Sequence, residues 1–554
     1  MENSPNGMDD QTLLYLACLI FGVLALAKVN SWYLLWDKVP THRFGFVLFC
    51  LLLGVIATCV ICRKSKVVTA SYLQKKSILG PGKDAVYCGR TLDKVPVYVK
   101  TRQRVMHTQV VGTTNAGKTE SVILPWAIQD MSQGRGLLLI DGKADRDLLE
   151  KLWSYAIKAG RAEDFRLFSL GTMSQSQTFN PLIGGTAEEI TERVFSAFTF
   201  ENPFYRGLQY EVLAQTLRIF EAAKEVPTFL KLHQGISKPA LLEPLCERFN
   251  DQSLNNWLMQ FRSLSGMERD QRTSGLTSQI SHFAFGKSAP LFNSTEPSIL
   301  IDDALATGKI IYFQLPVLLS PFLGAATGKL VLQSLQSAIA NRHRGSSQGK
   351  PFFSVYLDDF SEYLYPGFVS VLNKSRSANV GIVFAHQALG DIQTLGDPVA
   401  NAILTNSNLK IFMRGNDPDS AEHFSKIIGT KATVKFTERQ VKSVFKNQST
   451  GDLSAREVEE FIVHPNCFKQ DLGVGEAFMI IPHEKGSKTV RIKFDRYPDI
   501  LREPRPEICN SPAVGFALEE EQKRVQSESP AEVVKLQIKE SECSNGKNIS
   551  KKSA

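Results

Sequence analysis

The stretch that decides the fold of this 554-residue chain is Gly112-Thr113-Thr114-Asn115-Ala116-Gly117-Lys118-Thr119, which fits the phosphate-binding pattern G-x-x-x-x-G-K-S/T. A strand-like run at 108–111 leads into this loop, and a helix-compatible run at 120–130 follows it. In that setting the glycines let backbone N–H groups face phosphate oxygens, and the positive end of the helix adds to the attraction. We expect Lys118 to reach the β and γ phosphates and the Thr119 hydroxyl to hold Mg²⁺. The loop therefore predicts binding of ATP with Mg²⁺; the alternative is a chance glycine-rich turn.

Two adjacent carboxylates, Asp358 and Asp359, follow the apolar run 353–357 and offer the second half of such a site. Triphosphate hydrolysis needs one carboxylate to position Mg²⁺ and usually another to orient the attacking water. We assign Asp358 to the metal and Asp359 to the water, against the alternative of a solvated strand end. The next apolar run ends at His386 and Gln387. Gln387 is a candidate for contacting the γ-phosphate, whereas His386 is more typical of a packed or surface histidine.

An arginine from a neighbouring subunit commonly completes sites of this kind, because a guanidinium stabilises the charge spread over the transferring phosphoryl group. Arg376 and Arg414 are the candidates near the predicted site. A surface salt bridge is the alternative for each of them.

Four apolar runs, at 136–140, 309–315, 353–357 and 380–385, lack the alternation of a half-exposed strand and are typical of strands buried on both faces. Helical stretches such as 328–342 lie between them, which predicts an α/β fold with a doubly wound, parallel-rich sheet. The nucleotide is then expected at the carboxyl ends of the strands.

The strand pattern stops between residues 184 and 297, where the chain is amphipathic and rich in Leu, Phe, Glu and Arg. We interpret this segment as an all-α domain inserted into a nucleotide-binding domain formed by residues 67–183 and 298–501. Apolar content drops in residues 502–554, which predicts a flexible polar tail.

Two uncharged runs of 17 and 19 residues precede these domains and predict transmembrane helices at about 11–28 and 44–62, in a membrane anchor of residues 1–66. Buried core helices are the alternative for both. A signal peptide is the alternative for the first, but the leader 1–10 is acidic. The basic residues at 63–66 place the following domains in the cytoplasm.

Composition narrows the function little. The net charge of +8 and the pI near 8.8 are compatible with nucleic acid or an anionic membrane surface and diagnostic of neither. Cys59 and Cys62 have C-x-x-C spacing but lie in an apolar run, and no second such pair is present, so a zinc site is not indicated.

In order and spacing, these features resemble the coupling ATPases of type IV secretion and conjugation, the TraD/TraG-type coupling proteins. The similarity covers roughly residues 10 to 500 and rests on paired N-terminal spans, the phosphate loop and the strand ending at Asp358-Asp359. Further points of similarity are residues 178–182, 311–316, and Arg376 eleven residues before Gln387. The sequence of residues 112–120 and 141–143 is most similar to the branch of this family that serves IncI-like conjugation and Dot/Icm-type export.

The resemblance implies a RecA-like motor in a homo-hexameric ring, anchored as a multi-pass protein in the bacterial inner membrane and joined to components of a secretion channel. It also implies an ATPase site formed by Lys118, Thr119, Asp358, Asp359, Arg376 and Gln387, with Arg376 acting in trans. One departure is that the family usually has Asp-Glu where this chain has Asp358-Asp359, so slow turnover is an expectation.

The function expected from the sequence is therefore a coupling ATPase that recruits a relaxase–DNA complex, protein effectors or both, and feeds them to a type IV secretion channel. One alternative is a DNA-pumping ATPase of the FtsK/HerA kind. Another is a non-catalytic membrane receptor for substrates.

Overall fold

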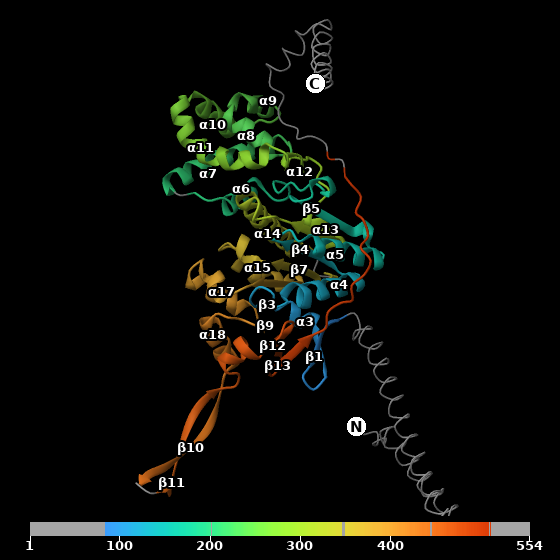
Figure 1. Ribbon diagram of the computed structural model, residues 1–554. Helices are drawn as coiled ribbons and strands as arrows, with labels where there is room; N and C mark the ends of the chain where they lie inside the picture. Colours follow the sequence, from blue (N-terminus) through green and yellow to red (C-terminus); the bar gives the residue numbers. More distant parts are fainter. Residues whose placement is uncertain (1–83, 201, 346–348, 444–445, 509, 511–554) are drawn as a thin grey trace, which may run out of the picture. The chain divides into compact units, whose positions relative to one another are not determined.

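A computed structural model describes residues 84–508 and 510, apart from residues 201, 346–348 and 444–445. Within this part of the chain the main sheet has eleven strands in the order β2-β1-β13-β12-β9-β3-β8-β7-β4-β6-β5 (Figure 1). The seven strands from β9 to β5 are parallel to one another, and the other four are added antiparallel at one side. The predicted parallel-rich α/β fold is confirmed.

The parallel strands place the candidate residues at a common edge. In the order of the sheet they are β9 (Leu409–Met413), β3 (Thr108–Val111), β8 (Val380–His386), β7 (Phe353–Asp358), β4 (Gly136–Asp141), β6 (Ile310–Gln314) and β5 (Phe165–Ser169). The carboxyl ends of β3, β8, β7 and β4 therefore meet at one edge, which also holds the phosphate loop. We call it the carboxyl edge, and the opposite one the amino edge.

Alternate side chains of the central strands enter two different cores, which explains why these strands are apolar throughout. Leu138 and Ile140 of β4 belong to one core, and Leu137 and Leu139 belong to the other. One face is covered by α4 (Leu124–Ser132) and α5 (Arg146–Lys158). The other is covered by α13 (Ile301–Thr307), α14 (Pro321–Arg344), α15 (Phe368–Ser375) and α17 (Asp397–Asn406).

The segment between β5 and β6 is helical in its described residues. It contains α6 (Ala187–Ala197), α7 (Pro203–Ala222), α8 (Phe229–Ser237), α9 (Glu243–Cys246), α10 (Gln252–Ser263), α11 (Gly266–Ala284) and α12 (Ala289–Phe292). The Asn180 side chain amide, at the entrance to the segment, donates to the carbonyls of Pro227 (2.9 Å) and Ser294 (3.0 Å). Asn180 thus ties the beginning of the helical segment to its end.

The antiparallel side of the sheet consists of β12 (Glu476–His483), β13 (Gly486–Phe494), β1 (Ala85–Thr91) and β2 (Pro96–Lys100). The remaining α-helices of the described residues are α3 (Thr101–Arg104), α16 (Leu389–Gln393) and α18 (Pro418–Ile428). A separate two-stranded hairpin, β10 (Thr430–Ser443) with β11 (Lys446–Phe461), follows α18.

The first residues of the predicted polar tail, which is expected to begin at residue 502, pack against aromatic side chains of α5 and β5. The Arg505 guanidinium lies 4.8 Å from the ring centre of Trp153 and 5.0 Å from that of Phe165. An arginine counts as polar in a composition profile, yet it packs well on aromatic rings. Residues 511–554 lie outside the described part of the chain.

The predicted membrane anchor, residues 1–66 with spans at 11–28 and 44–62, also lies outside the described residues. In the part of the chain that the structure describes, no helix has both the length and the apolar character needed to cross a bilayer.

Candidate nucleotide-binding site

The phosphate loop needs glycine at both of its fixed positions. A Cβ on Gly112 would lie 2.8 Å from the Met413 Cβ atom, inside van der Waals contact. Gly117 has φ +98°, and a Cβ there would lie 2.9 Å from the Ser121 hydroxyl oxygen. The loop therefore owes its path to close packing at one end and a left-handed residue at the other.

Three neighbouring strand ends hold the loop in place. The Gly112 N–H donates to the His386 carbonyl at 3.3 Å, and the Thr113 N–H donates to the Arg414 carbonyl at 2.9 Å. The Gly475 N–H, at the start of β12, donates to the Ala116 carbonyl at 3.0 Å. The loop is thereby fixed over the carboxyl ends of β8 and β9.

Lys118 is buried, and its side chain folds back onto the loop. Its Nζ donates to the carbonyls of Gly112 (2.6 Å) and Thr113 (3.4 Å). Burial lowers the pKa of Lys118, and the charges of Asp358 and Asp359 offset only part of that effect. A phosphate placed in the loop would give this ammonium a stronger partner than two carbonyls.

A hydrogen bond from Thr119 to Asp358 joins the two halves of the candidate site. The Thr119 hydroxyl donates to Asp358 Oδ2 at 2.6 Å, across 239 positions of the sequence. Burial raises the pKa of Asp358 to about 6; the charge of Asp359 adds to this effect, and the Thr119 hydrogen bond opposes it. A buried carboxylate so weakly compensated is suited to a cation.

A third carboxylate, Asp141, stands at the end of β4 directly beside Asp358 in the sheet. It accepts hydrogen bonds from the N–H groups of Lys143 (2.9 Å) and Asp145 (2.6 Å) and from the Tyr312 hydroxyl (2.9 Å). Sequence reasoning gave this residue no role. The available signal was an apolar strand ending in Asp-Gly-Lys, the same pattern that singled out Asp358.

Asp359 occupies a left-handed backbone conformation with φ 46° and ψ 49°, which aspartate tolerates better than most residues. Its carboxylate forms an ion pair with the Lys143 ammonium at 2.8 Å. The ion pair with Asp359 outweighs the effect of burial on Lys143, so the pKa of Lys143 is raised. Sequence reasoning missed Lys143 as well.

Gln387 reaches the loop, whereas His386 is packed beneath it. The Thr114 hydroxyl lies 3.5 Å from Gln387 Oε1, and the Gln387 side chain is exposed. His386 is buried and contacts the Ala388 carbonyl (2.8 Å) and the Gln109 side chain (3.0 Å). Burial lowers the pKa of His386 to about 4, so the ring is neutral at neutral pH.

The two candidate arginines lie at opposite edges of the sheet. Arg414 follows β9 at the carboxyl edge, where its carbonyl binds Thr113. Arg376 is exposed and stands before the first residue of β8, whereas Gln387 follows the last. The seven residues of β8 span roughly 20 Å. Within one chain the structure therefore does not bring Arg376 to the phosphate loop.

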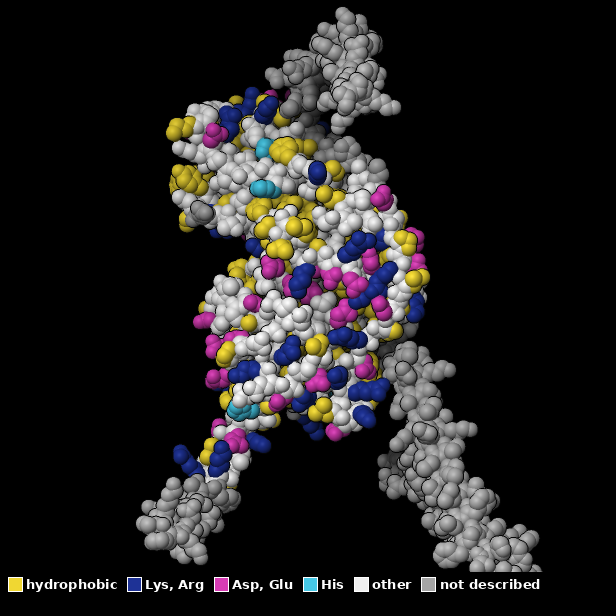
Figure 2. Space-filling model, viewed as in Figure 1, with side chains coloured by type: hydrophobic (Ala, Val, Ile, Leu, Met, Phe, Trp, Pro, Cys, Tyr) yellow, Lys and Arg dark blue, Asp and Glu magenta, His cyan; other side chains and the backbone are white. Residues whose placement is uncertain are grey.

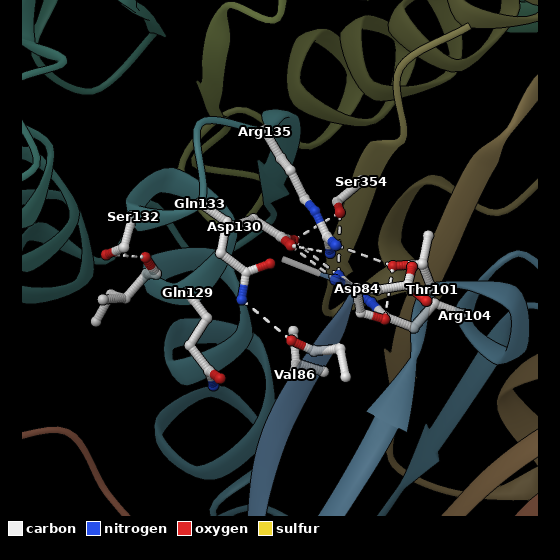
Figure 3. Close-up of polar contacts among 12 residues, drawn as sticks. Asp84, Val86, Thr101, Arg104, Gln129, Asp130, Ser132, Gln133, Arg135 and Ser354 are labelled. Atoms are coloured by element: carbon white, nitrogen blue, oxygen red, sulfur yellow. Dashed lines mark hydrogen bonds and ion pairs between the residues drawn. The ribbon is translucent and has the colours of Figure 1, made fainter. Parts of the chain in front are cut away.

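The amino edge holds a second buried polar cluster, which the sequence did not predict. The Arg104 guanidinium forms two parallel 2.7 Å bonds to the Asp130 carboxylate. Asp130 also accepts from the hydroxyls of Ser354 (2.6 Å) and Tyr356 (2.5 Å). Figure 3 shows Arg104, Arg135 and Ser354 converging on Asp130. Burial opposes ionisation of Asp130, but the charge of Arg104 prevails, so the pKa of Asp130 is lowered.

The carboxyl edge fits Mg²⁺ and a triphosphate by the chemistry of its donors. In the described residues, no group of three or more His, Cys, Asp or Glu side chains is arranged to hold a metal. Mg²⁺ is commonly bound through one or two carboxylates together with water and substrate phosphates. The Asp358 carboxylate and the Thr119 hydroxyl are a suitable pair for that role.

Comparisons with known proteins point to one group. Residues 353–469 match the family described as the TraM recognition site of TraD and TraG. The type 4 coupling protein DotL of Legionella pneumophila subsp. pneumophila is 22% identical over 415 residues, covering 64% of this chain and 53% of DotL. The chain thus spans about half the length of this curated relative.

Solved structures of the bacterial conjugative coupling protein TrwB share the fold. The unbound form of TrwBdeltaN70 has a TM-score of 0.55 at 13% identity, covering 76% of this chain and 91% of that one. The complex of TrwB with ADP and Mg²⁺ has a TM-score of 0.53 at 14% identity, with coverage of 74% and 90%. The predicted resemblance to type IV coupling proteins is confirmed. For the coupling-protein structures, identities this low establish the shared fold alone.

Proposed function

We propose that this chain is a membrane-anchored coupling ATPase that receives DNA or protein substrates and delivers them to a type IV secretion channel. The observation that carries the proposal is the 2.6 Å hydrogen bond between Thr119 and Asp358, which unites a phosphate loop with an acidic strand end. Related structures support it, since TrwB was solved with ADP and Mg²⁺ and with a non-hydrolysable ATP analogue.

The phosphate loop binds and orients the triphosphate in this proposal. Backbone N–H groups of residues 112–119 face the phosphates, and Lys118 exchanges the carbonyls of Gly112 and Thr113 for phosphate oxygens. Thr119 and Asp358 hold Mg²⁺, which neutralises charge developing on the phosphates when bound. Asp359 orients the attacking water. Gln387, which follows the last residue of β8, contacts the γ-phosphate and senses its loss.

The position of Arg376 is compatible with a ring of subunits. This side chain is exposed at the amino edge, away from the phosphate loop of its own chain. We assign it to the site of a neighbouring copy, where it stabilises the transition-state charge. The proposed assembly is a homo-hexamer with a RecA-like motor domain.

The anchor and the partners complete the proposal. Residues 11–28 and 44–62 span the bacterial inner membrane and leave the ATPase domain in the cytoplasm, where it meets channel components. The cargo is a relaxase–DNA complex, protein effectors or both. Figure 2 shows acidic and basic side chains interspersed over the visible face, without a large field of one sign. That face therefore favours neither cargo class.

The test measures ATP turnover and substrate transfer by the full-length protein in membranes. Lys118→Ala is expected to abolish both while membrane insertion is unchanged. Lys309→Ala is the matched control, because Lys309 also forms an ion pair, to Asp164 at 3.0 Å, away from the phosphate loop. Unchanged transfer by Lys118→Ala would refute the motor. A wild-type chain without turnover would support a receptor, and DNA movement without a secretion channel would support an FtsK/HerA-like pump.

A further inference from the structure

The side chain of Lys143 points toward the acidic residues at the carboxyl edge. Its Nζ lies 2.8 Å from Asp359 Oδ2. Lys118, by contrast, directs its ammonium at the carbonyls of Gly112 and Thr113. Among the described residues, Lys143 is the one lysine or arginine in a salt bridge with either Asp358 or Asp359.

The backbone around Lys143 is held before any ligand arrives. Asp141 accepts a hydrogen bond from the N–H of Lys143 and another from that of Asp145. Asp145 in turn caps α5 by accepting from the N–H groups of Asp147 and Leu148. The turn that carries Lys143 is therefore fixed at both ends, and only the side chain is free to choose a direction.

Asp359 needs such a partner. Its side chain is 6% exposed, and it is adjacent in sequence to the buried Asp358. Lys143, with 57% of its side chain exposed, approaches from the solvent side of the pair. A short carboxylate on a left-handed backbone has few directions open to it, and the ammonium selects one of them.

We propose that Lys143 is a positioning residue of the ATPase site, whose ammonium holds the Asp359 carboxylate in the direction that orients the attacking water. The inference rests on the proposed function, because it takes Asp359 as the water-orienting group. It does not require Lys143 to touch the nucleotide.

The test compares Lys143→Ala, Lys143→Arg and Asp359→Asn in the full-length protein, with Lys309→Ala as the control. Lys143→Ala is expected to lower kcat by about 10- to 100-fold, which is the usual cost of removing a residue that holds a functional side chain in its orientation. The affinity for a fluorescent, non-hydrolysable ATP analogue with Mg²⁺ is expected to stay within about threefold, because the phosphate loop is intact. Lys143→Arg is expected to recover much of the lost turnover, since it restores a cation.

A double variant separates positioning from general structural support. If Lys143 acts through Asp359, adding Lys143→Ala to Asp359→Asn will lower kcat no further. Full turnover by Lys143→Ala, or losses that multiply in the double variant, would overturn the inference while leaving the ATPase in place. Absence of turnover in the wild-type chain would instead overturn the proposed function.

Discussion

The two edges of the central sheet both bury carboxylates, but they compensate them very differently. At the amino edge, Asp130 accepts two bonds from Arg104 and one each from Ser354 and Tyr356, and its pKa is lowered. At the carboxyl edge, Asp358 accepts from the Thr119 hydroxyl and from the Asp359 N–H at 3.1 Å, and its pKa is raised to about 6. A satisfied buried charge belongs to the scaffold, whereas an under-compensated one is ready for a cation from outside. The contrast identifies which edge carries chemistry.

Arg104→Ala should have the largest effect, because it removes the two 2.7 Å bonds to the buried Asp130 and leaves that carboxylate with the more distant Arg135, 3.4 Å away, as its cation. We expect a loss of about 3–5 kcal/mol in the free energy of unfolding. Urea denaturation of the purified protein measures it. A loss below about 1 kcal/mol would mean that the amino edge is not the satisfied scaffold described above.

Asp358→Asn should show the opposite pattern at the carboxyl edge. We expect turnover to fall by at least about 100-fold, because the metal loses its carboxylate. The free energy of unfolding is expected to stay equal or rise, since a poorly paired buried charge is removed. Turnover assays and urea denaturation on the same preparation test both statements. A variant that unfolds easily, or that turns over normally, would erase the difference between the edges.

A matched pair of tyrosines sharpens the comparison. Tyr356→Phe removes a hydroxyl that donates to Asp130 and accepts from Arg104, and should cost about 1.5–3 kcal/mol. Tyr312→Phe removes a hydroxyl from Asp141, which keeps two backbone donors, so its cost should be nearer 1 kcal/mol. Thermal and urea unfolding rank the two variants, and equal costs would contradict the account.

The smallest effect expected is on pH dependence. Because the pKa of Asp358 is raised to about 6, its carboxyl takes up a proton below that pH and loses its value as a Mg²⁺ ligand. Mg²⁺-dependent affinity for an ATP analogue should therefore fall about fivefold between pH 6 and pH 5. The effect of Asp358 on folding stability has the opposite sign. Between pH 6 and pH 4 the folded state binds the proton more readily than the unfolded state, so this group adds to the free energy of unfolding as pH falls. Asp358→Asn should lack both trends.

The sequence was informative where one local pattern dictates one structure. The phosphate loop and the apolar strands at 136–140, 309–315, 353–357 and 380–385 followed from spacing and side-chain type alone. Their side-by-side order in the sheet then brought Asp358 to Thr119. Parallel strands with a polar residue at the carboxyl end place such residues together without further information.

Partners from distant segments were beyond that reasoning. Arg104, Asp130 and Tyr356 are polar residues with no shared motif, and only the folded sheet reveals that they meet. Lys143 and Asp359 are more than two hundred positions apart, and a lysine after a strand is usually a solvated one. Arg505 looked like part of a polar tail until Trp153 and Phe165 were seen beneath it.

The central claim is that the Thr119–Asp358 contact marks a Mg²⁺–triphosphate site at the carboxyl edge. A structure of the full chain with Mg²⁺ and a non-hydrolysable ATP analogue tests it most directly. The account predicts the metal bound to the Thr119 hydroxyl and the Asp358 carboxylate, with the Lys118 ammonium moved from the Gly112 carbonyl to the phosphates. An analogue bound elsewhere, with Lys118 still on Gly112 and no metal at Asp358, would contradict it.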